Sequence, residues 1–90
     1  MPLERGRVIG YDASRMTFEF TMMDKAKIVD CDISSTAMDV LVGVRGTIPA
    51  EREAQFLRLR DTIERIASDL FDKGLATPSG MIRIFRHHVR

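Results

Sequence analysis

The sequence predicts an α+β fold, in which two helices pack on one face of a small, largely antiparallel sheet. Three observations lead to this prediction. Residues 15–23 and 26–33 alternate between apolar and polar side chains, which is the period of a half-buried strand. Residues 49–73 instead repeat apolar side chains at steps of three and four, as one face of a helix does. Residues 81–87 alternate again, so the order of elements is β-β-β-α-α-β, which fits neither a βαβ alternation nor a bundle of helices.

The first three strands are predicted to lie before residue 34. Residues 7–11 form a short first strand, and residues 12–14 form a turn, because Asp and Ser side chains satisfy backbone groups locally. Residues 15–23 and 26–33 then form an antiparallel hairpin around a short polar turn. The predicted apolar face of this hairpin combines alternate residues of both strands: Met16, Phe18, Phe20 and Met22 beside Val29, Cys31 and Ile33.

Two helices of unequal length follow the hairpin. Ser34 is a good N-cap for a helix over residues 35–42, and Gly43 is placed to end it. Residues 44–48 form a loop, and Pro49 suits the first turn of the long helix, where a missing amide hydrogen costs nothing. The long helix carries one apolar stripe, which we expect to cover the hairpin face: Phe56, Leu59, Ile63, Ile66 and Leu70.

The long helix is predicted to stop at Gly74, and residues 76–80 form a turn rich in helix breakers. A last strand over residues 81–87 would direct Ile82 and Ile84 to one face. The pattern leaves open whether this strand joins the sheet at an edge or inserts beside an earlier strand.

Length and composition indicate one globular domain of 90 residues, with residues 1–6 and 88–90 expected to be flexible. The net charge of +1 argues against a domain devoted to nucleic-acid binding, which usually carries a clear basic excess. A single cysteine allows no internal disulfide and is typical of a reducing compartment. The N-terminus lacks a signal-peptide pattern, and no apolar run is long enough to span a bilayer. We therefore expect a soluble cytoplasmic protein with no membrane association.

Five short motifs follow one another between Tyr11 and Ile84. They are Tyr11-Asp12-x-x-Arg15-Met16-x-Phe18, Val29-x-Cys31-x-Ile33-Ser34, Ala37-Met38, Phe56-x-x-x-Arg60-x-x-Ile63-Glu64-x-x-Ala67 and Pro78-x-Gly80-x-Ile82-x-Ile84. Their order and spacing resemble a family of small bacterial proteins known as domain of unknown function 1488. The resemblance implies a small α+β fold in a bacterial cytoplasm. It implies no activity and no functional residue.

Cys31 is the one candidate nucleophile. A catalytic thiol needs a lowered pKa, and the start of the first helix nearby favours one. However, Cys31 alternates in phase with the predicted core, and the charges of Asp30 and Asp32 beside it would raise a thiol pKa. We interpret Cys31 as a core residue. Asp30, Asp32 and Asp39 could supply an acid pair, but spacings of two on a strand are common in solvated faces, so we predict no catalytic residue.

His87 and His88 are the only histidines and invite comparison with a metal site. Adjacent residues of a strand point to opposite faces, so this pair could not readily chelate one ion. No third ligand has the spacing of a metal site with them. We predict no metal ion and no cofactor.

Two surfaces remain as candidates for a partner. Arg83, Arg86 and Arg90 make the C-terminus basic and suggest weak contact with nucleic acid, or else a charged edge strand that discourages pairing. Leu57, Phe71 and Leu75 lie off the main stripe and could face a protein partner or a second copy, or else widen the core. Because no catalytic motif stands out, we expect a non-enzymatic interaction or regulatory module, with nucleic-acid binding as the alternative and a Cys-dependent enzyme as the least supported reading.

Overall fold

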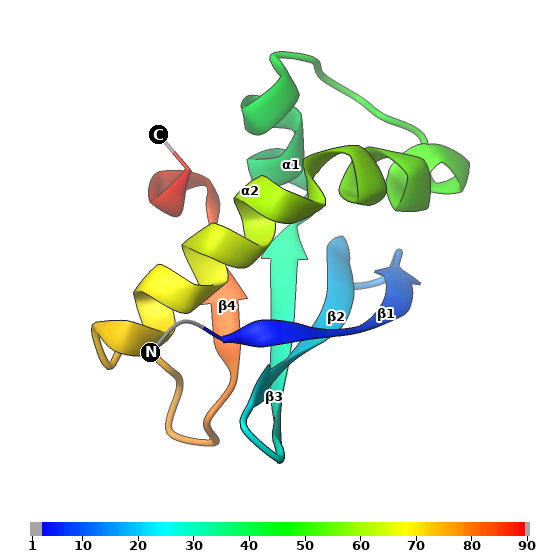
Figure 1. Ribbon diagram of the computed structural model, residues 1–90. Coiled ribbons are helices and arrows are strands. Elements are labelled where there is room, and N and C mark those ends of the chain that lie inside the picture. The colour runs from blue at the N-terminus through cyan, green and yellow to red at the C-terminus, as the bar shows by residue number, and fades with distance from the viewer. Residues whose placement is uncertain (1–2, 90) are drawn as a thin grey trace.

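The computed structural model describes residues 3–89, which form one four-stranded sheet and two α-helices (Figure 1). The elements, in chain order, are β1 (Glu4–Asp12), β2 (Thr17–Asp24), β3 (Lys27–Ser34), α1 (Ser35–Val42), a 3-10 turn η1 (Pro49–Glu51), α2 (Arg52–Asp72), β4 (Ile82–Ile84) and a second 3-10 turn η2 (Arg86–His88). This is the predicted β-β-β-α-α-β order, so the α+β prediction is confirmed.

The strands lie in the order β1-β2-β3-β4, so the last strand joins the sheet at an edge. β1, β2 and β3 pair antiparallel as a meander, whereas β4 runs parallel to β3. The parallel pairing arises because the chain leaves the end of β3, passes through α1 and α2, and returns to the end of the sheet at which β3 begins (Figure 1). The sheet is therefore mixed, with one parallel pair that the sequence did not specify.

β1 is longer than the predicted strand over residues 7–11. The prediction was too short because two irregularities interrupt the alternation of the strand. The register with β2 shifts between Arg5 and Val8 and again between Val8 and Gly10. At Gly6 the two backbones approach closely, since an added Cβ would lie 2.4 Å from the carbonyl oxygen of Thr21. A bulged strand bends and loses its period of two, which hides it from a periodicity argument.

Residues 3–6, for which a flexible start was expected, pack against the rest of the domain. Leu3 is buried, and its amide donates to the Oγ of Ser68 on α2 at 3.0 Å, while β1 begins at Glu4. The first two residues lie outside the described residues. The sheet therefore starts almost at the N-terminus.

The hairpin of β2 and β3 supplies one half of the core, as predicted. Phe18, Phe20 and Met22 are buried and pair in register with Ile33, Cys31 and Val29. Met16 is the exception to the predicted face. It precedes β2 in a left-handed conformation (φ 55°), and its side chain is 56% exposed.

α2 crosses this face of the sheet and supplies the other half of the core (Figure 1). Phe56 stacks on Phe18 at a ring-centroid distance of 4.5 Å, and Ile63 and Leu70 continue the buried stripe. Leu59 and Ile66 are only partly buried at its margins. α1 follows directly from β3, begins with the Oγ of Ser34 accepting from the amide of Ala37 at 3.1 Å, and ends at Gly43.

The C-terminal segment differs from the predicted strand over residues 81–87. β4 ends at Ile84, and η2 continues the chain, with Val89 partly packed against the core. Residues 88–90 were expected to be flexible; His88 lies in η2, Val89 packs partly against the core, and the last residue lies outside the described residues.

Candidate functional site

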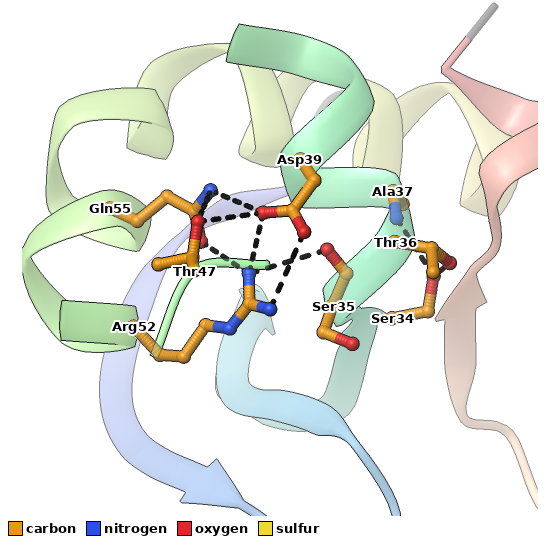
Figure 2. Close-up of polar contacts among 8 residues, drawn as sticks. All are labelled: Ser34, Ser35, Thr36, Ala37, Asp39, Thr47, Arg52 and Gln55. Carbon is orange, nitrogen blue, oxygen red and sulfur yellow. Dashed lines mark hydrogen bonds and ion pairs between the residues drawn. The ribbon is translucent and has the colours of Figure 1, made fainter. Parts of the chain in front are cut away.

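A buried polar cluster lies where α1, α2 and the loop between them meet (Figure 2). Its centre is Arg52, in the first turn of α2, which is only 4% exposed. Arg52 Nη1 donates to Asp39 Oδ1 at 2.8 Å and to Gln55 Oε1 at 2.7 Å. Asp39 Oδ1 also accepts from Thr47 Oγ1 and from Gln55 Nε2, each at 2.9 Å. One carboxylate oxygen therefore connects both helices and the loop.

The cluster keeps both charges in a nearly dry environment. Burial acts to raise the pKa of Asp39, but hydrogen bonds from Arg52, Gln55 and Thr47 outweigh it and hold the pKa below its ordinary value of 3.8. The guanidinium carbon of Arg52 also lies 5.6 Å from the centre of the Tyr11 ring, a cation–π distance. Asp39 is thus ionised at neutral pH, and the cluster fixes the start of α2 against α1.

The surface above this cluster is apolar and hollowed. Val40, Val42 and Val44, at the end of α1 and in the following loop, are 41%, 37% and 48% exposed. One hollow of about 490 Å³ lies between α1 and η2, and another of about 460 Å³ lies along the first turns of α2. Both hollows reach Val44 and the loop. We call Val40, Val42 and Val44, with these two hollows, the valine end.

The charged residues around the valine end are mainly basic. Arg45 lines both hollows, Arg86 lines the first and Arg58 lines the second. The carboxylates there are Glu51 and Asp39, and Asp39 is already engaged by Arg52. The valine end therefore combines exposed aliphatic side chains with excess positive charge.

The valine end was not predicted from the sequence. The available signal was the run Val40-x-Val42-x-Val44, because valines two residues apart cannot all face inward on a helix that buries Ala37 and Met38. The run crosses from the helix into a loop, so its exposure depends on where Gly43 ends α1.

The predicted partner surface of Leu57, Phe71 and Leu75 is not continuous. Leu57 and Leu75 are exposed, but Phe71 is partly packed against the core. Leu57 and Phe71 are separated by about 21 Å along α2, from the rise of about 1.5 Å per residue. Between them, Asp61 and Glu64 form ion pairs with Arg5. These three apolar residues therefore do not form one patch.

Arg83 and Arg86, two of the predicted basic C-terminal residues, are not found together on one surface. Arg83 pairs with the buried carboxylate of Asp32 on β3, with Nη2 and Oδ2 3.2 Å apart. Arg86 lies on η2 and lines the first hollow. Arg90 lies outside the described residues. Arg83 and Arg86 therefore have different roles: Arg83 pairs with a carboxylate in the sheet, and Arg86 lines a hollow on the surface.

His87 and His88 do not point to opposite faces of a strand, because η2 replaces the predicted strand there. The two rings lie 4.0 Å apart between centroids, and His88 Nδ1 accepts from the amide of Phe85 at 2.9 Å. Burial, together with the charge of His87, lowers the pKa of His88. Across residues 3–89, no three His, Cys, Asp or Glu side chains gather as metal ligands would.

Cys31 packs in the core, as predicted. Its Sγ lies 3.6 Å from the carbonyl oxygen of Val29. Burial, with the charges of Asp30 and Asp32 adding to it, raises the pKa of Cys31 to about 12. The thiol is therefore protonated at neutral pH. Asp39 and Asp32 pair with different arginines, so the three candidate aspartates do not form one acid site.

These features define a small α+β domain with an open, basic and apolar end. A sequence model described as "Protein of unknown function (DUF1488)" matches residues 5–84, and the chain belongs to this family. A crystal structure of a DUF1488 protein of unknown function from Shewanella loihica PV-4 superimposes with a TM-score of 0.81 at 18% identity. The match covers 91% of this chain and 90% of that protein, so the two share their fold. A comparison with curated proteins found no match.

Within the described part of the chain, no helix combines the length and apolar character needed to cross a membrane.

Proposed function

We propose that this protein is a non-enzymatic protein-interaction or regulatory module that binds its partner at the valine end. The observation that carries the proposal is the coincidence of three exposed valines with two hollows at one end of the molecule. Contiguous exposed apolar surface rimmed by polar residues is typical of interaction sites. The hollows are also in the range of about 300–1,000 Å³ that holds ligands or anchoring side chains.

The support beneath this surface favours a preformed binding site. Thr47, in the loop, and Arg52, in α2, both hold the carboxylate of Asp39 on α1. A loop fixed at its base loses less conformational freedom when a partner binds, and affinity rises accordingly. Val44 would then meet the partner on a rigid support.

The non-enzymatic part of the proposal rests on the surroundings of the candidate catalytic groups. Cys31 is buried with a protonated thiol, and the carboxylates of Asp32 and Asp39 are already paired with arginines. We also propose a bacterial cytoplasmic location, with which the single buried cysteine is compatible.

Selection from a random peptide display library tests the proposal. We expect the wild-type protein to enrich a set of peptides, and Val44→Asp to lose them, because a negative charge would replace an apolar side chain that lines both hollows. Leu75→Asp is the matched control, since Leu75 is also exposed, at 58% against 48% for Val44, but follows α2 at the opposite end of the molecule. Circular dichroism would verify that each variant is folded. Equal binding by Val44→Asp and wild type, or loss only in Leu75→Asp, would contradict the proposal.

The alternative of weak nucleic-acid binding through the C-terminal strand has less support. Arg83 is committed to Asp32, so the strand itself presents little free positive charge. A labelled single-stranded oligonucleotide would be expected to show no binding that depends on Arg83.

A further inference from the structure

We propose that the valine end recognises an acidic peptide segment, in which carboxylate side chains alternate with or flank apolar ones. This inference rests on the proposed function and adds the chemistry of the partner to it. Its basis is the charge that surrounds the two hollows.

Three arginines meet at the valine end without carboxylate partners of their own. Arg45, Arg58 and Arg86 are exposed, and no carboxylate among residues 3–89 forms an ion pair with them. Arg5, Arg52, Arg60 and Arg83 each pair with Asp or Glu, whereas Arg7, Arg15 and Arg65 are also exposed without an ion pair among residues 3–89 but do not line the two hollows. The guanidinium fork fits a carboxylate with two parallel hydrogen bonds, which makes arginine suited to this recognition.

Hydrogen bonds to two carbonyl groups at the end of α1 reduce the negative potential that would oppose an acidic ligand. A helix C-terminus normally presents free carbonyl groups and the negative end of its dipole. Here the amide of Gly43 donates to the carbonyl of Val40, and the amide of Val44 donates to the carbonyl of Asp39. The second hollow lies along the first turns of the 21-residue helix α2, where the dipole is positive.

The apolar lining favours a peptide over nucleic acid. Single strands are bound mainly by aromatic side chains that stack on bases. Among residues 3–89, no aromatic side chain lines either hollow, and the apolar contacts come from Val40, Val42, Val44 and Ala54. Phe85, near Arg86, stacks instead on His87 with their centroids 5.9 Å apart. Valines beside arginines match a peptide that carries both aliphatic and carboxylate side chains.

The composition of the displayed peptides selected by wild type tests the inference. We expect enrichment in Asp and Glu beside Leu, Ile, Val or Met. A synthetic copy of the best peptide should bind the double variant Arg45→Gln/Arg58→Gln about tenfold more weakly or worse, an effect of about 1.4 kcal/mol or more. Arg65→Gln is the control, because Arg65 is exposed on α2 but lines a different part of the surface, near Ser68 and Asp72. Binding should also weaken as salt is raised.

The outcomes separate the two proposals. Peptides that depend on Val44 but carry no acidic excess would overturn this inference and leave the interaction module standing. Failure to enrich any peptide that depends on Val44 would remove the interaction module itself. A single-stranded oligonucleotide that binds wild type and is lost in Arg45→Gln/Arg58→Gln, while acidic peptides do not bind, would overturn the inference in favour of nucleic acid.

Discussion

Two arginine–carboxylate networks join α2 to the rest of the molecule, and their geometries are alike while their surroundings differ. Arg52 and Asp39 approach to 2.8 Å with side chains that are 5% and 13% exposed. Arg5 approaches Asp61 to 2.7 Å and Glu64 to 2.9 Å, but Arg5 and Asp61 are 49% and 95% exposed. Water therefore screens the Arg5–Asp61 pair strongly and the Arg52–Asp39 pair much less. The difference shows that ion-pair distance alone says little about stability.

The two networks also connect different parts. Arg5 joins the bulged strand β1 to the middle of α2, where Leu3 and the core already hold the two together. Arg52 joins α1, the loop and the start of α2, and so supports the valine end. Breaking the buried network should therefore affect both stability and the proposed binding surface.

Replacing Arg52 with Ala should give the largest effect. The change leaves the Asp39 carboxylate buried without its counter-charge, and breaking a buried pair on one side costs about 3–5 kcal/mol. Urea unfolding followed by circular dichroism would measure the loss. The double variant Arg52→Met/Asp39→Leu should recover most of it, because no buried charge then remains. A loss in Arg52→Ala no larger than that in Arg5→Ala would contradict the contrast between the networks.

The reactivity of the Cys31 thiol offers a second measure of the difference between the two ion-pair networks. Because the thiol is buried and protonated, a disulfide reagent should modify native protein near pH 8 only when the domain opens. Opening becomes tenfold more frequent for each 1.4 kcal/mol of lost stability, so a loss of about 3–5 kcal/mol should make Arg52→Ala react at least about a hundredfold faster than wild type. Arg5→Ala should react at nearly the wild-type rate. Fast modification of wild type in the absence of denaturant would show that Cys31 is accessible.

Acid should weaken the buried network over a defined range. Because the pKa of Asp39 is lower in the folded chain than in the unfolded chain, the unfolded chain binds more protons in acid. The stabilisation is therefore fully present above about pH 5 and is lost as pH falls below 3.8 and through the folded pKa. Asp39→Asn should lose stability less steeply than wild type over this range in urea unfolding. Parallel curves for the two proteins would show that Asp39 does not contribute to the acid dependence.

Replacing Arg5 with Ala should have the smallest effect. The Arg5 guanidinium is half exposed and Asp61 is almost fully exposed, while the more buried Glu64 keeps Arg60 as a partner at 3.0 Å, so removing Arg5 leaves no buried charge without a counter-charge. The midpoint of thermal unfolding should change little, and the remaining difference from wild type should vanish in 1 M NaCl. A difference that persists in high salt would indicate that packing of the Arg5 side chain, and not its charge, holds β1 to α2.

The sequence predicted those elements whose signal is local. The hairpin and α2 have an uninterrupted period, and the caps Ser34 and Gly43 lie beside the helix they bound. β1 was truncated in the prediction because its bulges break the alternation, and the parallel pairing of β4 depends on where a long crossover returns. The sequence did not show that Leu57 and Phe71 fail to form one patch, because their heptad relation says nothing about Arg5, which reaches Glu64 between them from a distant strand.

The polar cluster lay beyond the reach of sequence patterns for a related reason. Asp39 and Arg52 occupy different helices, and each looks like an ordinary surface residue in its own helix. Only the folding of the loop brings them together.

The irregular strand β1 bears on how this protein can meet other chains. It forms one edge of the sheet, and its two register shifts break the regular row of amides and carbonyls that a neighbouring strand would need. The opposite edge, β4, has only three residues. Both borders of the sheet are thus poor templates for backbone pairing. Edge-to-edge pairing of strands, which leads to aggregation, is therefore disfavoured. Contacts with other chains must instead be made by side chains on the surface of the domain.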